Sequence, residues 1–521
     1  MSGSVATLTE ILKPEGRAAP GLPGDAKEGL FDRVSSLFRV IDMLPDEMSD
    51  EEVEGLMGVL PGDSRKSLTA MLIPRAREGS LAFMKCLSTW LDEAKRSPDE
   101  GRKTFLVPFC FPPELVHAFD KGFPITSEVL SSLAVVALEG QGERYYDMAL
   151  GIGLPDHICS SNAIEIGSML GSDDFQPQAI INAATGSCDI NAKTHELISL
   201  YHGIPQFILE KPVDDSERGK EQYRRNYLGL IHRMEEFLDE ELTEEKLRRT
   251  CEKVNVCNEL LAELWDLHKN VPDPVPNLFS LYTYGTRFSM WGTDAAIDAI
   301  RAYVDVSKRR LKEGAYPADR EIARCLLTYT SYYFDLAALF NWMEEQGYSY
   351  LGDGLDLLFP ITIDTSSYDS MVSGLAEEAW NMPMTHQVGG ESMSMCWLED
   401  ALYSAKDLGA NVAIYSGHHS CKQTWSVASI MREELMKRAG VPMLVLQGDS
   451  WLKRTTPIGV IQEQIDEFIK NVVSEKRTGK RKIRRRLEEK TSDSPSPLGG
   501  EGRPDSPSPL GGEGRGEGAM L

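Results

Sequence analysis

Apolar residues recur every three or four positions within the first hundred residues, a spacing that predicts helices. The stretches with this spacing are 31–44, 50–60 and 80–96. Asp50 stands at the start of the second stretch and is a candidate helix N-cap. Residues 1–30 are rich in glycine, proline and alanine, and we expect them to be loosely ordered. Residues 1–100 are therefore predicted to form a helical N-terminal extension.

Two later segments alternate short apolar runs with helical stretches, which is the pattern of a parallel β-sheet. The predicted strands lie at 104–109, 179–185, 205–212, 323–330, 411–417 and 441–449. We expect an α/β fold with two doubly wound parallel-sheet domains, residues 101–214 and 319–475. The segment between them, 215–318, is long, charged and predicted to be helical because its apolar positions also recur at three and four.

The two α/β domains share a local arrangement that predicts an internal pseudo-repeat. A strand is followed by a loop with a cysteine, then a helix, then Ile-Pro or Val-Pro, and then the next strand. This arrangement occurs around Cys188 and again around Cys421. In open α/β sheets ligands bind at the carboxyl ends of the strands, which is where these cysteines fall.

Residues 476–521 have the composition of a disordered tail. DSPSPLGGEGR occurs twice, and such a Pro/Gly/Ser repeat buries too little apolar surface to offset its ordering entropy. The run 476–486 carries eight basic residues, which fits a solvated extension better than a nucleic-acid or membrane patch. Without the tail, residues 1–475 hold 44 basic and 73 acidic side chains, a net charge of −29.

Composition and charge narrow the class of protein. A chain of 521 residues with 41% hydrophobic and 26% charged residues is typical of a globular protein with real cores. The acidic body argues against a broad surface for nucleic acid or an anionic membrane, so an anionic substrate needs a local basic pocket. We expect no signal peptide and no membrane span. The nine cysteines are irregularly spaced, and we expect a reduced, cytoplasmic protein.

Three cysteines are placed where an apolar strand is predicted to turn into a helix: Cys159, Cys188 and Cys421. A thiol there meets the positive end of a helix dipole and unpaired N–H groups, which favour the thiolate that binds iron or zinc. Cys110 has the same placement and is a fourth candidate. No Cys-x-x-Cys pair occurs, and dispersed cysteines are often plain buried side chains, so a shared metal site and three core cysteines both remain open. The others are expected in the core: Cys86, Cys251, Cys257, Cys325 and Cys396.

Several polar residues near Cys421 are candidates for a substrate pocket. His418 and His419 could donate hydrogen bonds to a substrate carbonyl or to cluster sulfur, or could cap the next helix. Lys422 could meet an anionic substrate. Asp449 and Arg454 are expected to form a structural ion pair, with contact to a cofactor as the alternative. No phosphate-binding G-x-x-x-x-G-K-[ST] and no dinucleotide G-x-G-x-x-G after a strand occurs, so nucleotide chemistry within this chain is not supported.

The run from Gly417 to Ile469 resembles the C-terminal part of the 2-hydroxyacyl-CoA dehydratase and benzoyl-CoA reductase family. PPELVHAF, DHICSSN, SCDINAK and IPQFILEKP resemble further parts of that family in the same order. The likeness covers residues 104–212 and 320–472, about half of the chain, and neither the N-terminal helices nor the tail takes part. It implies that Cys159, Cys188 and Cys421 hold a [4Fe-4S] cluster with one open iron.

The resemblance also implies a mechanism and partners. A separate ATP-hydrolysing iron–sulfur activator would deliver one electron, which the cluster passes to a CoA-thioester carbonyl to give a ketyl radical anion. His418, His419 and Lys422 would then be catalytic residues, and a homologous second subunit would complete a hetero-oligomer. Both a dehydratase and a benzoyl-CoA reductase fit. The alternatives are an electron-transfer or non-catalytic paralogue without an acyl-CoA site, and an α/β binding protein with no metal.

Overall fold

The computed structural model describes the parts of the chain that carry the fold. These are residues 29–30, 34, 41, 44–45, 48–59, 62–109, 111–171, 176–183, 188–212, 216–316, 318–356, 360–382 and 393–472. Cys110, most of the helix expected at 31–44, and the tail expected to be disordered lie outside the described residues. The described residues up to Lys470 belong to one compact unit.

Two four-stranded parallel sheets form the framework, and their strand orders are equivalent. The first sheet has the order β2-β1-β3-β4 and the second has the order β6-β5-β7-β8. The strands are β1 (Lys103–Val107), β2 (Gly122–Thr126), β3 (Ala179–Asn182), β4 (Gln206–Ile208), β5 (Ala323–Leu327), β6 (Tyr348–Tyr350), β7 (Val412–Tyr415) and β8 (Met443–Val445). All six strand pairs are parallel. The predicted fold class and the internal repeat are confirmed.

Each sheet is doubly wound by helices that cover its faces. The first carries α6 (Glu114–His117), η1 (Val129–Glu139), α7 (Gly142–Gly151), α8 (Ser160–Gly171) and α9 (Asp189–His202). The second carries η2 (Tyr333–Asp335), α14 (Leu336–Glu345), α15 (Tyr368–Trp380), α16 (Met393–Asp407), α17 (Lys422–Glu434), η3 (Leu435–Ala439) and a last helix from 458. In both halves the strand order reverses between the two central strands, which is where such sheets bind ligands.

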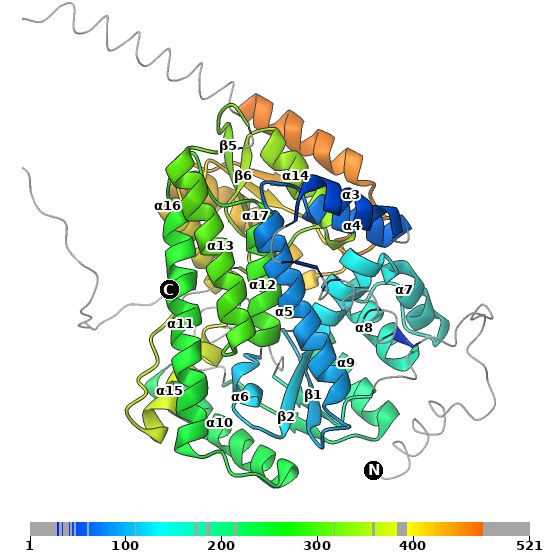
Figure 1. The fold of residues 1–521 in the computed structure, drawn as a ribbon, viewed down its shortest axis with the longest axis vertical. Helices are drawn as coiled ribbons and strands as arrows, with labels where there is room; N and C mark the ends of the chain where they lie inside the picture. The colour runs from blue at the N-terminus through cyan, green and yellow to red at the C-terminus, as the bar shows by residue number, and fades with distance from the viewer. Residues whose placement is uncertain are drawn as a thin grey trace, which may run out of the picture. The chain divides into compact units, whose positions relative to one another are not determined.

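Long helices connect the two halves. The middle segment folds into α10 (Glu217–Leu238), α11 (Glu244–His268), α12 (Leu278–Met290) and α13 (Asp294–Glu313). In Figure 1, β1 and β2 lie near the bottom and β5 and β6 near the top, with α5 (Arg77–Arg96), α11, α12 and α13 alongside. The α5 helix packs through Phe83, which stacks on Tyr282 of α12, and through Trp90, which donates a hydrogen bond to Pro124 of β2. The N-terminal helices are therefore part of the same packed core.

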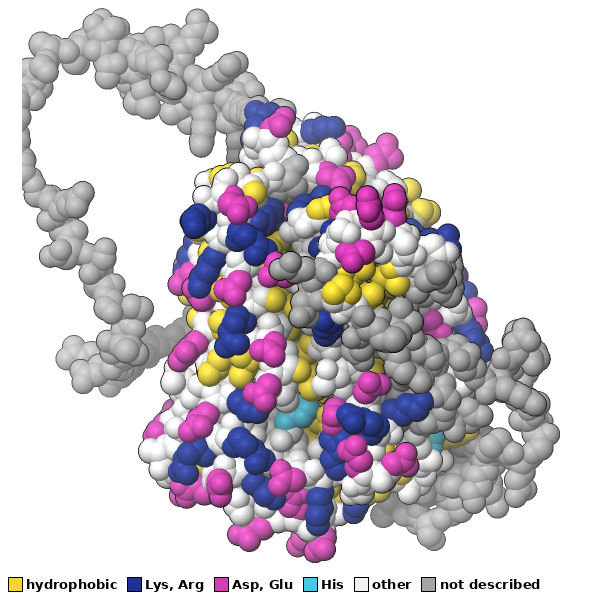
Figure 2. All heavy atoms as spheres, viewed as in Figure 1, with side chains coloured by type: hydrophobic (Ala, Val, Ile, Leu, Met, Phe, Trp, Pro, Cys, Tyr) yellow, Lys and Arg dark blue, Asp and Glu magenta, His cyan; other side chains and the backbone are white. Residues whose placement is uncertain are grey.

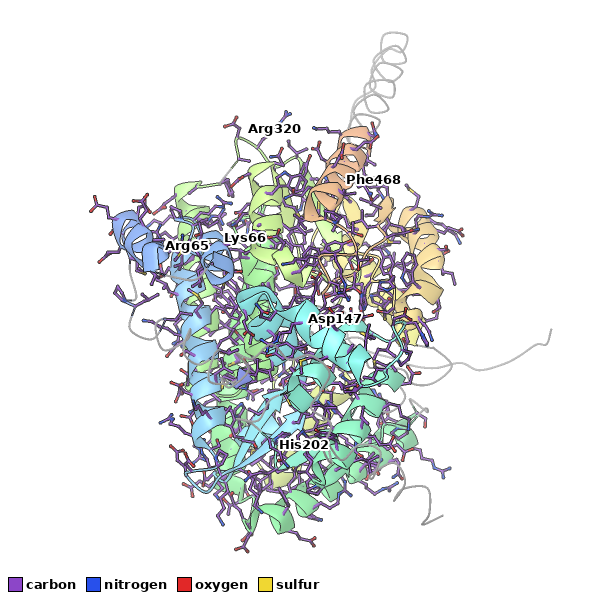
Figure 3. All side chains as sticks on the ribbon, turned by 90° about the vertical axis from the view of Figure 1, so that its right-hand side faces the viewer. Arg65, Lys66, Asp147, His202, Arg320 and Phe468 are labelled. Atoms are coloured by element: carbon purple, nitrogen blue, oxygen red, sulfur yellow. The ribbon has the colours of Figure 1, made fainter. Side chains whose placement is uncertain are left out.

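The first helices pack against the second half of the chain. They are α3 (Asp50–Val59) and α4 (Gly62–Met71). Lys66, labelled in Figure 3, binds Asp335 with Nζ and Oδ2 2.9 Å apart. The expected cap of α3 is displaced by one residue, because the hydroxyl of Ser49, not Asp50, accepts the N–H of Glu52 while Glu52 accepts the N–H of Ser49. Asp50 instead binds Arg77.

The α7 and α8 helices approach each other unusually closely, and Gly167 permits this. A Cβ on Gly167 would lie 1.9 Å from the carbonyl oxygen of Tyr145, which is backbone and cannot rotate away. The order of elements here corrects one prediction: Cys159 follows α7 and a turn, and not a strand. Because Cys159 lies at the N-terminus of α8, its position depends on how α8 packs on α7.

We expect Gly167→Ala to destabilise the protein by about 1–3 kcal/mol or more, because the added methyl group must push α7 and α8 apart. Gly55→Ala in α3 is the matched control. Nothing lies within 4 Å of its Cβ position, so higher helix propensity should add roughly 0.5–1 kcal/mol. Urea unfolding of both variants measures the difference, and equal stability of the two would refute the close-packing argument.

The surface charge and the composition of the helices bear on whether the protein binds nucleic acid or spans a membrane. In Figure 2, Lys/Arg and Asp/Glu side chains are interspersed over the visible face, with no broad basic patch on it. Among the described residues, no helix is both long and apolar enough to cross a bilayer.

Candidate functional site

The loops that follow the central strands of both sheets surround one cavity of about 300 Å³. Phe109 follows β1, Cys188 follows β3, Tyr329 follows β5, and Cys421 follows β7. The cavity thus lies at the reversal point of both strand orders at once, between the two α/β halves. Three other cavities among the described residues are smaller, with volumes of about 30, 20 and 180 Å³.

All three thiols predicted as ligands line this cavity: Cys159, Cys188 and Cys421. Each immediately precedes a helix: α8, α9 and α17, respectively. All three are free and half-buried. Two belong to the first half of the chain and one to the second, so only the assembled fold brings them together.

The environment of the thiols differs from the sequence prediction in one respect. Burial raises the pKa of Cys159 well above its ordinary value, and the nearby Cys421 and Cys188 raise it further. Burial likewise raises the pKa of Cys188 to about 12, although the N–H of Asn191 works in the opposite direction. Helix N-termini do supply N–H donors, as expected, but desolvation and mutual repulsion outweigh them. Three thiolates at this place require a compensating positive charge.

The loop that carries His418 and Cys421 is held by Gly417. Its φ is 70°, and a Cβ there would lie 1.8 Å from the carbonyl oxygen of Leu446, so only glycine fits. His418 is fully buried, with Nε2 3.5 Å from Sγ of Cys159 and 3.0 Å from Oγ of Ser420. Burial lowers its pKa to about 4, so its ring is neutral near pH 7.

The buried carboxylate of Asp449 organises this loop. Its Oδ2 lies 3.5 Å from Nδ1 of His418 and 3.3 Å from Nδ1 of His419. It also accepts the hydroxyl of Ser160, at the start of α8, and the N–H groups of Trp451 and Leu452. Burial works to raise the pKa of Asp449, but the histidines and these donors together hold it below its ordinary value.

This arrangement corrects the expected Asp449–Arg454 ion pair. Arg454 instead binds Asp147 of α7, labelled in Figure 3, at 2.7 Å. Asp449, His418 and His419 are also close enough to hold a metal ion. The hydrogen bonds to Asp449 already account for the grouping of these three residues.

We expect Asp449→Ala to cost roughly 3–5 kcal/mol, because it leaves the buried donors of Ser160, Trp451 and Leu452 without their acceptor. Asp147→Ala is the control, since its exposed pair with Arg454 contributes about 1 kcal/mol or less. Chemical denaturation of the two variants checks this. Similar losses for both would contradict the organising role of Asp449.

The remaining candidates lie in different places. Lys422 lines the cavity and is exposed at its rim, together with Asp189 and His157. Gln423 donates a hydrogen bond to Asp189 at 2.8 Å and so ties α17 of the second half to α9 of the first. His418 and His419 do not line the cavity. His418 lies behind Cys159, and the His419 side chain is 49% exposed.

Sequence reasoning missed Glu128, the one acidic side chain that is buried among the described residues of the cavity wall. Its Oε2 accepts the N–H of Phe109 and the hydroxyl of Ser127, and its Oε1 accepts the amide of Asn191. Burial raises its pKa to about 7, with a further contribution from the charge of Glu165. A carboxyl with this pKa can take up or release a proton near neutrality. It stands inside an apolar run of the sequence, which carries no signal of its role.

Two buried polar atoms in residues of the cavity wall lack hydrogen-bond partners among the described residues. They are Oγ of Ser161 and Oδ1 of Asn191. Buried polar atoms are nearly always satisfied, so these two are consistent with a bound group that has polar atoms of its own.

The fold and site define a class: an α/β protein with two sheets whose strand-end loops build one thiol-lined ligand cavity. The family model of the 2-hydroxyglutaryl-CoA dehydratase D-component matches residues 108–472, well over half of the chain. The chain therefore belongs to the 2-hydroxyglutaryl-CoA dehydratase D-component family. The match includes Cys159, Cys188, Cys421 and Glu128, and its name indicates a component that works with another. No curated protein matches the sequence.

Proposed function

We propose that this chain is the iron–sulfur catalytic subunit of a 2-hydroxyacyl-CoA dehydratase or of a related benzoyl-CoA reductase. The observation that carries the proposal is the convergence of three free thiols, from both halves of the chain, on one cavity. Membership of the dehydratase family adds the reaction class.

The donor set fits a [4Fe-4S] cluster held by Cys159, Cys188 and Cys421. Thiolates are the usual ligands of such clusters, and because burial raises the pKa values of Cys159 and Cys188, their thiolate forms would need a positive partner. Three thiolates would leave one iron of such a cluster without a protein ligand. When bound, the cluster would supply one-electron reduction of the thioester carbonyl, primed by a separate ATP-hydrolysing activator.

The protein's own residues would orient the substrate and move a proton. The aromatic and aliphatic wall excludes water from the reacting atoms. Glu128 is buried and faces the cavity, so it is placed to accept a proton from the bound acyl group. Lys422, exposed at the rim, is the local positive charge that an anionic CoA thioester requires on an acidic protein.

His418 would act differently from the role expected from sequence. It does not line the cavity, so we assign it to positioning Cys159 through its Nε2, with Asp449 fixing the ring. His419 would assist through the same carboxylate. We further propose a reduced cytoplasmic location, since the thiols are free, and a homologous second subunit as partner.

An anaerobic assay tests the proposal. The chain, its partner subunit, the activator, ATP and a strong reductant are combined with 2-hydroxyacyl-CoA and aromatic acyl-CoA thioesters. ATP-dependent loss of water assigns a dehydratase, and ATP-dependent ring reduction assigns a reductase. Turnover without ATP, or no thioester binding at all, contradicts the proposal. Full iron with no thioester binding would favour the electron-transfer paralogue.

A further inference from the structure

The inner wall of the cavity combines rings and aliphatic side chains with four buried polar side chains, those of Glu128, Ser161, Asn162 and Asn191. Its residues include Ile158, Tyr284, Tyr329, Leu355 and Trp451, all buried, and the half-buried Phe109. Their neighbours hold the rings in place: Trp451 stacks on Tyr333 with centroids 5.1 Å apart, and Tyr284 makes an edge contact with Phe288 at 4.8 Å. Burial of an apolar group against these rings and aliphatic side chains is energetically favourable.

The charged groups of the wall are distributed unevenly. Lys422, Asp189 and His157 are exposed at the rim, where water screens them. The only charged residue buried in the described wall is Glu128, which is acidic. No arginine lies among the described residues that line the cavity. A free distal carboxylate on a bound acyl group would therefore find no buried cation among these residues and would face the like charge of ionised Glu128.

We infer that the acyl group accepted here is uncharged and apolar or aromatic, rather than the dicarboxylic 2-hydroxyglutaryl group for which the family is named. This inference rests on the proposed function, since it concerns the substrate of the same cavity. The Tyr284 hydroxyl remains a neutral donor, because burial raises its pKa well above the ordinary value. A neutral hydroxyl can donate a hydrogen bond to a thioester oxygen but cannot neutralise a distal carboxylate.

The difference in affinity follows from desolvation. Burying an ionised carboxylate without a cationic partner costs more than its hydrogen bonds return, whereas a phenyl or isobutyl group gains from contact with this wall. We expect 3-phenyl-2-hydroxypropionyl-CoA and 2-hydroxy-4-methylpentanoyl-CoA to bind at least about tenfold more tightly than 2-hydroxyglutaryl-CoA.

Equilibrium binding of these three thioesters and of free CoA to the anaerobic holoprotein, with its partner subunit, tests the inference. Tighter binding of the two apolar thioesters supports it. Preference for the glutaryl thioester overturns it but leaves the proposed function standing. Binding no tighter than that of free CoA for all three overturns the proposed function itself. The wild-type panel needs no variant and so does not depend on a mutant folding.

A variant with a positive charge in the cavity wall provides a second test of the inference. Leu355→Arg supplies the missing buried cation, and we expect it to reverse the order of affinities toward 2-hydroxyglutaryl-CoA. Leu200→Arg is the matched control, because it makes the same change on the exposed face of α9, outside the cavity wall. An unchanged order of affinities in a folded Leu355→Arg protein would contradict the assignment of this wall to the acyl group.

Discussion

Replacing any one of Cys159, Cys188 and Cys421 with alanine is expected to remove most of the bound iron and all turnover. Each thiol lines the same cavity, and each comes from a different loop, so none can substitute for another. With two thiolates the site loses both a ligand and part of its negative charge. Anaerobically purified wild type should carry about four iron and four sulfide per chain.

Two other cysteines provide the controls. Cys251→Ala in α11 and Cys325→Ala in β5 remove fully buried thiols that do not line the cavity. Iron content and the visible absorption spectrum should stay at the wild-type level in both. Full iron in all five variants would show that the cluster is not held by these sulfurs.

Glu128→Gln is expected to lower kcat by about 10²–10⁴, the range typical of a lost general base, while iron content stays unchanged. The amide keeps the size of the side chain and the acceptor for the N–H of Phe109, so the loop should remain in place. Wild-type activity should rise with pH through about 7, as Glu128 ionises, and the variant should lack that rise.

The pH dependence of the free energy of unfolding separates the effect of protonating Glu128 from the effect of its packing. The pKa of Glu128 is raised from 4.5 to about 7 in the folded protein, so the folded state binds more protons between these values than the unfolded state. The stability associated with the protonated side chain is present below pH 4.5 and is lost as pH rises through about 7. Glu128→Gln should lack this component of the pH dependence. A kcat equal to wild type across this range would remove Glu128 from the reaction.

The sequence predicted those strands that form short apolar runs bounded by loops and failed where tertiary context decides. The runs predicted as strands overlap β1, β3, β4, β5, β7 and β8. The β2 strand was missed because Pro124 lies within it, and proline is tolerated there only because β2 is an edge strand. The three residues of β6 are too few to form a pattern.

In the candidate site, too, local features were predicted from the sequence and distant contacts were not. The repeated arrangement around Cys188 and Cys421 could be predicted because a strand end, a loop and a helix start are local features. The role of Glu128 depends on Asn191 and Phe109, distant in sequence, and the true partner of Arg454 is Asp147, more than 300 residues away. No spacing rule reaches such pairs. Cys159 was selected for the same predicted placement, but its helix follows a turn and not a strand, so the local pattern was wrong there although the residue does line the cavity.

The segment from Asp449 to Arg454 belongs to the second half of the chain but is bonded to three helices of the first. Asp449 binds Ser160 of α8, Trp451 donates to Ser132 of η1, and Arg454 binds Asp147 of α7. Rotation of one half away from the other would break all of these bonds together. These bonds oppose such a rotation and so help to hold the spacing of Cys159 and Cys421. Lys422, Asp189 and His157 are exposed at the rim of the cavity, and passage of a molecule between them would leave these bonds and the sulfurs in place.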